Sequence, residues 1–317
     1  MESLRLLSII LVIFIFSCKD KKKIVQNSPE AQEYLQFINS QKEFKLSNNH
    51  SIKYIDEGAH HTKTILLVHG VPTSSWLYRK MIPQLVEKGY RVIAPDMLGY
   101  GQSDMPNGYN LYLPKAMSGY LLELMDGLNI STWEHLCHDA GSLWTWEALK
   151  IDIISQKVSR LYILNSIMFK NGFNPPIQMK RNWFSKTYVK SYSSSMLRKG
   201  TMKTIIKNGL SQKEMCTPSM LYGYTAPSQE RLDHALFSFF SNTCVEDLED
   251  FEPLFKRLKM PIKVVWGAQD KILDWAKQQD KVKKALKLQE GDILILQNAK
   301  HFIQEERPKK IVDFVTN

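Results

Sequence analysis

Short, nearly continuous apolar segments alternate with helical stretches along most of this sequence, and this alternation constrains its fold most strongly. Ile65–Val68, Leu161–Leu164 and Val264–Trp266 are examples of the apolar runs. Runs of this kind are typical of strands buried on both faces of a mainly parallel sheet. The segments between them, such as Trp76–Glu87 and Leu143–Lys150, favour helices. The pattern predicts a doubly wound α/β fold, with a mostly parallel central sheet flanked by helices.

One long segment interrupts the alternation. The expected strands are Ile52–Glu57, Thr64–His69, Arg91–Pro95, Glu134–His138, Arg160–Asn165, Ile262–Gly267 and Asp292–Gln297, preceded by a weak edge strand near Phe44–Leu46. From about Phe169 to Asn242 no convincing central strand occurs, and the segment is rich in aromatic residues and Met. We therefore expect a helical insertion after the sixth strand. The predicted domains are a core at 46–168 and 243–317 and a helical cap at 169–242.

Composition excludes several classes of function. The chain has 317 residues, 44% of them hydrophobic and 23% charged, which is ordinary for a globular protein. This length can bury a large core without a disulfide framework or a structural metal. The net charge of +10 raises the possibility of an anionic partner, but the basic residues are scattered apart from the run at 19–23. Without zinc-ligand spacing, a phosphate-binding glycine loop or a nucleic-acid motif, we expect no nucleic-acid partner, metal or cofactor.

The amino terminus has the features of an export signal. Arg5 precedes an apolar run at 6–17 that is too short to span a bilayer comfortably, and Cys18 follows at once. The segment 1–18 resembles a bacterial lipoprotein signal, which implies lipidation of Cys18; an uncleaved signal anchor is the alternative. Either way we expect an exported protein, tethered to a membrane on the periplasmic or outer face. Residues 19–45 would then form the tether and the entry to the core.

Two further cysteines leave a question open. Cys216 and Cys244 could pair in an oxidising compartment, but the sequence does not establish that their separation suits a disulfide. The sequence also leaves the oligomeric state open.

Four expected strands end in unusual residues. Ligands of open α/β sheets bind beyond the carboxyl ends of the strands, so these positions are the place to look for a site. The first carries His69-Gly70-Val71-Pro72, and the second runs through Cys137 and His138 into Asp139. The third is followed by Asp270, and the last by His301. The chain order of candidate nucleophile, acid and histidine is the order found in α/β-hydrolases.

The segment around Asp139 fits a nucleophile elbow, in which a tight strand-to-helix turn presents one side chain above the sheet. That turn tolerates only small residues two places either side of the nucleophile. Cys137 and Gly141 satisfy this with Asp139 at the apex, whereas Ser142 as nucleophile would place Trp144 at a position that needs a small residue. Sterics therefore favour the aspartate over the serine.

Each candidate also has a structural interpretation. Asp139 could cap the following helix, Asp270 could cap a helix that begins near Leu273, and His301 could be an ordinary core histidine. We favour Asp139 as nucleophile, His301 as base and Asp270 as the acid that orients His301. For His69 we expect a structural hydrogen bond to its own loop.

The motifs resemble those of the haloalkane dehalogenases and the related epoxide hydrolases. The matching segments are His69–Arg79, Arg91–Asp104 and His301–Glu306, and the resemblance covers roughly 52–315. It implies an α/β-hydrolase fold with a helical cap and the same three catalytic residues. It also implies an oxyanion hole formed by the backbone N–H groups of Val71 and Ala140.

Two positions depart from the dehalogenase pattern. That family usually has Trp directly after the nucleophile and Asn or Glu after His-Gly, and here these positions are Ala140 and Val71. Removing preorganised donors from a developing anion costs roughly 2.7–4 kcal/mol each, so efficient halide release is doubtful. Trp183 of the cap could supply a donor, and Tyr222 and Tyr224 could protonate an epoxide oxygen or simply pack between cap and core.

The sequence thus predicts a hydrolase that forms an alkyl-enzyme ester with a small apolar electrophile. Two alternatives remain: an acyl esterase of the same fold, and a non-catalytic binding protein on this scaffold. The sequence does not name the substrate, because the cap determines the pocket.

Overall fold

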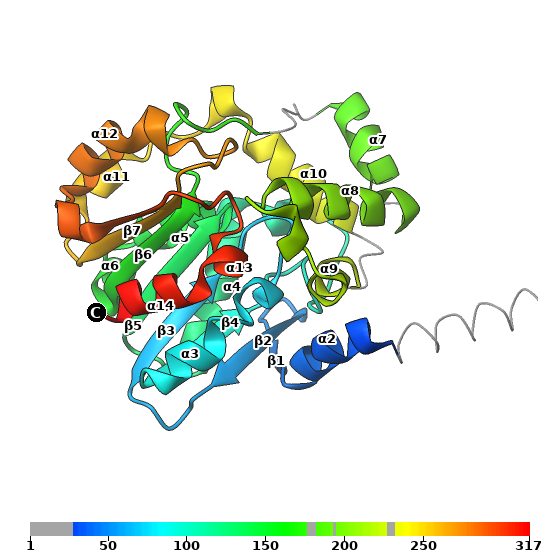
Figure 1. The fold of residues 1–317 in the computed structure, drawn as a ribbon, viewed down its shortest axis with the longest axis horizontal. Coiled ribbons are helices and arrows are strands. Elements are labelled where there is room, and N and C mark those ends of the chain that lie inside the picture. The colour runs from blue at the N-terminus through cyan, green and yellow to red at the C-terminus, as the bar shows by residue number, and fades with distance from the viewer. Residues whose placement is uncertain (1–27, 176–181, 193–194, 227–231) are drawn as a thin grey trace, which may run out of the picture.

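The computed structural model describes residues 28–175, 182–192, 195–226 and 232–317 (Figure 1). The expected signal segment, Cys18 and the lysine run lie outside the described residues. Within the described ranges, no helix combines the length and the apolar character needed to cross a bilayer.

An eight-stranded sheet forms the centre of the molecule. Its strands are β1 (Lys42–Lys45), β2 (Ser51–Glu57), β3 (Lys63–Val68), β4 (Tyr90–Pro95), β5 (Trp133–Asp139), β6 (Val158–Ser166), β7 (Ile262–Gly267) and β8 (Ile293–Leu296). Their spatial order is β1-β2-β4-β3-β5-β6-β7-β8. β2 pairs antiparallel with β1 and β4, and all later pairs are parallel. Every observed strand overlaps its expected segment, so the predicted α/β-hydrolase sheet is confirmed.

Helices cover both faces of the sheet because each central strand is apolar on both sides. Leu66 and Val68 of β3 belong to one apolar cluster, and their neighbours Ile65 and Leu67 belong to the other. Outside the insertion the helices are α2 (Pro29–Asn39), η1 (Ser75–Tyr78), α3 (Ile82–Glu87), η2 (Tyr109–Tyr112), α4 (Pro114–Gly127), α5 (Gly141–Leu149), α6 (Asp152–Lys157), η4 (Val245–Asp247), α11 (Glu252–Arg257), α12 (Trp275–Leu286), η5 (Glu290–Asp292), α13 (Ile303–Glu306) and α14 (Pro308–Thr316).

Two expectations about the amino-terminal part need correction. The helix expected over Trp76–Glu87 is divided into η1 and α3, because Pro83 has no N–H to continue a helix and is tolerated only in a first turn. The region expected as a tether contains α2, which packs on the cap helix α9. Ala31 and Tyr34 of α2 are buried, and Phe37 and Ile38 pack against the same apolar cluster as Tyr34, so an apolar face holds this helix to the rest of the molecule.

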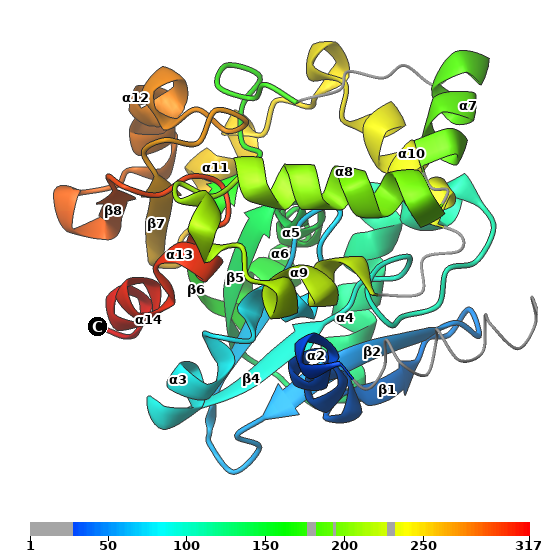
Figure 2. The same ribbon diagram turned by 45° about the vertical axis from the view of Figure 1, so that its right-hand side comes forward.

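The connection between β6 and β7 carries the insertion. It contains α7 (Trp183–Tyr192), α8 (Ser195–Asn208), η3 (Lys213–Met215), α9 (Pro218–Thr225) and α10 (Leu232–Asn242). Figures 1 and 2 show these helices gathered over one end of the sheet. The insertion therefore follows the sixth strand, as expected. Cys216 and Cys244 are both free thiols.

Candidate active site

Asp139 occupies a strained turn between β5 and α5. Its φ of 51° lies in the left-handed region, which a non-glycine residue adopts only when its surroundings enforce it. A Cβ on Gly141 would lie 2.5 Å from the carbonyl oxygen of His69, so the turn packs tightly against the loop after β3. This close approach is the physical reason for the small residue that the elbow geometry requires at position 141.

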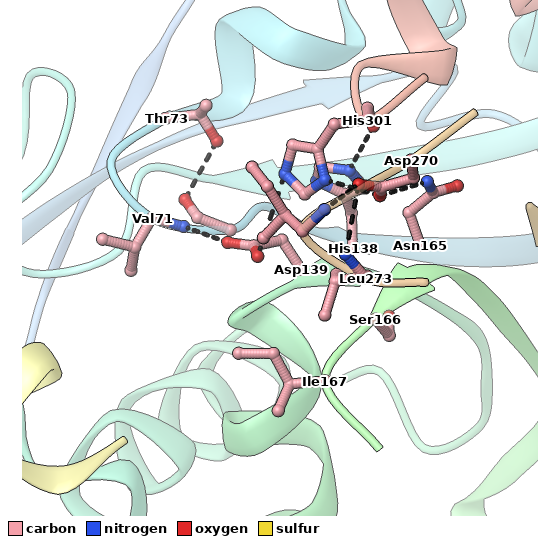
Figure 3. Close-up of polar contacts among 12 residues, drawn as sticks. Val71, Thr73, His138, Asp139, Asn165, Ser166, Ile167, Asp270, Leu273 and His301 are labelled. Carbon is pink, nitrogen blue, oxygen red and sulfur yellow. Dashed lines mark hydrogen bonds and ion pairs between the residues drawn. The ribbon is translucent and has the colours of Figure 1, made fainter. Parts of the chain in front are cut away.

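The carboxylate of Asp139 is held by main-chain donors. Its Oδ2 accepts a hydrogen bond from the Val71 N–H at 3.0 Å (Figure 3). The backbone N–H of Ala140 also donates to this carboxylate. A Cβ on Gly70 would lie 2.5 Å from the same Oδ2, so the loop comes as close as a glycine allows. The two amides expected to form an oxyanion hole thus converge on the Asp139 side chain.

His301 lies between two carboxylates. Its Nε2 is 3.8 Å from Oδ1 of Asp139, and its Nδ1 is 2.9 Å from Oδ2 of Asp270. Figure 3 shows the imidazole reaching toward Asp139 from the loop that follows β8. The three residues predicted as nucleophile, base and acid are therefore brought together from separate strand ends.

Asp270 accepts hydrogen bonds at both of its oxygens. Oδ1 receives the N–H groups of Ile272 at 2.9 Å and Leu273 at 3.1 Å, and Oδ2 also receives Nδ2 of Asn165 at 2.6 Å. The carboxylate thus caps the turn before α12 and orients His301 at the same time. The capping interpretation and the catalytic one are compatible.

Burial and charge shift the pKa values of these groups. Burial raises the pKa of Asp139, and the imidazolium of His301 and the amides of Ala140 and Val71 only partly offset this. Burial alone would lower the pKa of His301, but the charge and hydrogen bond of Asp270 raise it above its usual value. Burial would raise the pKa of Asp270, yet His301 and the hydrogen bonds from Asn165 and Leu273 lower it. The carboxylate of Asp270, with that of Asp139, therefore outweighs burial and makes the His301 ring easier to protonate than a free imidazole.

Two neighbouring side chains have structural hydrogen bonds only. His69 accepts from the Met97 N–H through Nε2 at 3.0 Å, so its Nδ1 carries the proton and donates to the Gly70 carbonyl at 2.8 Å. This is the structural role expected for His69. Ser142 is fully buried, and its hydroxyl contacts the carbonyls of Asp139 at 2.6 Å and Ile167 at 3.0 Å. The serine is thus engaged away from the cavity.

A cavity of about 440 Å³ adjoins Asp139 and His301. Its described lining is Val71, Pro72, Asp139, Phe173, Pro175, Thr204, Ile205, Asn208, Gly209, Leu236, Phe239, Phe240, Gln269, Asp270, Lys271, Ile272, Lys300, His301 and Phe302. Core loops and the cap helices α8 and α10 both contribute to this lining. Apolar side chains predominate around a few polar groups, as in small-molecule sites. Among the described residues, no cluster of His, Cys, Asp and Glu has an arrangement that could hold a metal ion.

The three aromatic residues considered for substrate contact lie elsewhere. Trp183 is 69% exposed on α7, and none of the three lines this cavity. The Tyr224 hydroxyl donates to Glu305 at 2.8 Å, while the Tyr222 ring packs against Tyr34 at 5.9 Å. The expectation of substrate contacts is corrected for these residues, because the two tyrosines face α13 and α2 instead. The other interpretation of Tyr222 and Tyr224, packing between cap and core, agrees with these contacts.

Two supporting residues were missed by sequence reasoning. Asn165 is the penultimate residue of β6 and has a φ of 31°; it donates to Asp270 and accepts from the Gly267 N–H at 3.0 Å. Its signal was a lone amide directly after the apolar run of β6. His138 reaches the carbonyl oxygen of His301 with Nε2 at 3.0 Å. No sequence signal separates it from an ordinary buried histidine.

Comparisons with known proteins agree with the fold. A family model described as alpha/beta hydrolase fold matches residues 63–200. A haloalkane dehalogenase from Mycolicibacterium paratuberculosis is 27% identical over 276 residues, covering 82% of this chain and 84% of that protein. An epoxide hydrolase from Caballeronia sordidicola is 37% identical over 108 residues, covering 34% of this chain and 32% of that protein.

Solved structures also match over most of the chain. Epoxide hydrolase A from Mycobacterium thermoresistibile superposes with a TM-score of 0.67 at 19% identity, covering 87% of this chain and 98% of that chain. At this identity the match shows the fold alone. The family model and the sequence relatives together support a hydrolase with the α/β-hydrolase fold that is similar to haloalkane dehalogenases and epoxide hydrolases.

Proposed function

We propose that Asp139 is the nucleophile of this hydrolase and forms an alkyl-enzyme ester with a small apolar substrate. The observation that carries the proposal is the position of its carboxylate. It lies at the apex of a left-handed turn, is held by the Val71 N–H at 3.0 Å, and adjoins both His301 and the cavity. In the first step, one carboxylate oxygen attacks an sp³ carbon and displaces a halide or opens an epoxide.

In the second step His301 acts as a general base. Its Nε2 takes a proton from water, and the resulting hydroxide attacks the carbonyl carbon of the Asp139 ester. The N–H groups of Val71 and Ala140 stabilise the charge that develops on the carbonyl oxygen. The bond between that carbon and the alkoxy oxygen then breaks, and the departing alkoxide takes the proton from His301 Nε2 and leaves as the alcohol. The new carboxylic acid of Asp139 loses its proton to solvent, which restores the carboxylate. Asp270 holds His301 in the tautomer that leaves Nε2 free to accept the proton.

The nature of the leaving group depends on the donors in the cavity. The side chains of Val71 and Ala140 contain no donor for a departing halide. The described lining offers the side-chain donors of Thr204, Asn208, Gln269, Lys271 and Lys300. We therefore propose dehalogenase-like or epoxide-hydrolase-like chemistry in which these polar groups, rather than an indole beside the nucleophile, face the leaving group.

A trapping experiment tests the nucleophile. A His301→Gln variant retains the first step but lacks the base for the second, so the ester should accumulate. Mass spectrometry of the proteolysed protein should locate the added alkyl group on the peptide that contains Asp139, with Asp139→Ala as the control. A parallel panel of haloalkanes and epoxides, assayed for halide and for diol, identifies the leaving group. If no alkyl electrophile gives an adduct, the proposal is wrong and a binding protein on this scaffold is favoured.

The acyl esterase alternative makes a different prediction. It requires Ser142 as the nucleophile, so Ser142→Ala would abolish cleavage of nitrophenyl esters. The buried hydroxyl donates to the carbonyls of Asp139 and Ile167, so we expect this variant to lose about 1 kcal/mol of stability and to keep its activity. Loss of all activity together with normal folding would favour the esterase.

We also propose that the enzyme is exported and tethered to a membrane through Cys18. The support is the basic residue, the apolar run at 6–17 and the cysteine that follows. Metabolic labelling with a radioactive fatty acid tests this: wild type should incorporate label, and Cys18→Ala should not. An unlabelled wild-type protein in the membrane fraction would instead indicate an uncleaved signal anchor.

A further inference from the structure

The chain that leaves α8 packs directly on the loop that carries His301. The carbonyl oxygen of Gly209 accepts two hydrogen bonds, from the N–H groups of His301 and Phe302, each at 3.1 Å. A Cβ at position 209 would lie 2.5 Å from two atoms of the Phe302 ring. This approach is therefore possible only for glycine, and it brings a main-chain acceptor of the cap onto the loop of the catalytic histidine.

One buried carboxylate strengthens the same contact. Oε1 of Glu306 accepts from the Lys300 N–H at 2.8 Å, and Oε2 accepts from the Ser211 N–H at 2.9 Å and from the Ser211 hydroxyl. Glu306 is 5% exposed, so losing these donors would leave a charge without partners in the interior. Gly209, Ser211, Glu306 and the loop 300–302 together are called the cap–histidine junction below.

The opposite side of the same peptide is held by the nucleophile strand. Burial lowers the pKa of His138 to about 3, so this ring is neutral. Since its Nε2 faces the carbonyl oxygen of His301 at 3.0 Å, Nε2 donates that hydrogen bond. The main chain of His301 is thus fixed through its N–H by the cap and through its C=O by β5. Asp270 fixes only the ring.

We infer that Glu306 is a positioning residue for His301, and that the cap–histidine junction couples the placement of the cap to the hydrolysis of the ester. This inference rests on the proposed function. The carboxylate of Asp139 is held by the amides of Val71 and Ala140, which the junction does not contact. Glu306 contacts the main-chain N–H of Lys300 and does not itself line the cavity. Alkylation therefore does not use Glu306 directly, whereas attack of water on the ester requires Nε2 of His301 in place.

The kinetic consequence separates positioning from general stability. A loosened junction slows ester hydrolysis, and a misplacement of about 1 Å can cost roughly 100-fold. For Glu306→Gln we expect kcat to fall by about 10- to 100-fold. KM should fall by the same factor, because the ester accumulates. The ratio kcat/KM, which reports the steps through alkylation, should stay within about twofold of wild type.

The matched control is Glu305→Gln. Glu305 lies on the same helix α13 and is also buried, but its carboxylate contacts Arg79, Lys80 and Tyr224 rather than the loop. This variant should lose stability yet show no accumulated ester per folded molecule. Mass spectrometry of the quenched reaction, with His301→Gln as the positive control, measures the fraction of alkylated Asp139. Equal accumulation in both variants, or a loss of kcat/KM in Glu306→Gln without accumulation, would overturn the inference.

Two further measurements test the inference if Glu306→Gln does not fold or if no substrate is known. If Glu306→Gln does not fold, Ser211→Ala removes only the hydroxyl donor, and it should still accumulate ester, by about 2- to 10-fold over wild type. An NMR titration of the His301 ring needs no substrate. Its pKa should move toward 6.5 in the junction variants and stay raised in Glu305→Gln. An unchanged His301 pKa in the junction variants would refute the inference even if the proposed function holds. A shifted pKa would support the junction even if His301→Gln yields no ester.

Discussion

Replacing Asp270 by Asn is the most informative single change that the site offers. The side chain keeps its shape, but four donors surround its two oxygens: His301 Nδ1 and Asn165 Nδ2 at Oδ2, and the N–H groups of Ile272 and Leu273 at Oδ1. An amide has one oxygen and one NH₂ group. In either orientation its NH₂ must face two donors.

The lower-cost orientation determines the effect on His301. Main-chain N–H groups cannot be reversed, so the amide oxygen should stay with Ile272 and Leu273 and the NH₂ should face His301. Asn165 cannot simply flip to compensate, because its Oδ1 accepts from the Gly267 N–H at 3.0 Å. His301 then moves its proton to Nε2 to accept at Nδ1. This tautomer cannot take a proton from water at Nε2.

The magnitude follows from that loss. In a serine protease triad the same carboxylate-to-amide change lowers kcat about 10⁴-fold through the wrong tautomer, which corresponds to about 5.4 kcal/mol in activation free energy. Here we expect ester hydrolysis to fall by about 10³- to 10⁴-fold, while alkylation changes by less than about tenfold. Unsatisfied buried donors cost about 1–3 kcal/mol each, so the free energy of unfolding should also fall by about that amount.

Stopped-flow and quenched-flow kinetics with a substrate that gives an ester would separate the two steps. The Asp270→Asn variant should show a burst of about one product equivalent followed by very slow turnover. Asp274→Asn is the matched control, since Asp274 lies just before α12 without a side-chain capping bond and should behave as wild type. If Asp270→Asn hydrolyses its ester at a near-normal rate, Asp270 is not the orienting acid and the reasoning fails.

Three other results are expected. Gly70→Ala places a Cβ 2.5 Å from Asp139 Oδ2. The rate of alkylation in single-turnover assays should fall by at least about tenfold. A normal rate would contradict the close packing of Gly70 against the Asp139 carboxylate. The pKa of His301, measured by NMR, should exceed 6.5 because of the carboxylate of Asp270. The rate of ester hydrolysis should therefore decline as the pH falls through that pKa, because His301 becomes protonated and can no longer act as the base. A rate that is independent of pH between 5 and 8 would exclude the base role. Arg79→Met leaves the buried Glu305 with Lys80 and the Tyr224 hydroxyl as its remaining partners and should lower the free energy of unfolding by about 3 kcal/mol in urea titrations. A loss below about 1 kcal/mol would show that the Arg79–Glu305 pair contributes little.

The chemistry of the elbow could be predicted because it is local. Small residues two places either side of Asp139 are a steric requirement of one turn, and a turn is specified by adjacent residues. The strands were predictable for a similar reason, since a strand that is buried on both faces of the sheet consists of a nearly continuous run of apolar residues. Asp270 and His301 followed from the position of strand ends, which bring distant residues to one edge of the sheet.

The orientation of the cap helices could not be predicted in the same way. Its helical character followed from the missing strands, but the residues facing the cavity did not. Tyr222 and Tyr224 were considered because they lie where the cap returns to the core, yet the rotation of α9 turns them toward α2 and α13. The lining instead comes from α8 and α10. Helix rotation depends on packing against several partners, which no local pattern encodes.

The sequence alone therefore determined the architecture of this hydrolase and the identity of its three candidate catalytic groups, since each is fixed by neighbours along the chain or by the order of strands. Only the tertiary structure decided which groups hold them: Asn165 on Asp270, His138 and Gly209 on the main chain of His301. These contacts join residues far apart in the chain through single polar atoms. Such pairings exist only after the cap and core have packed.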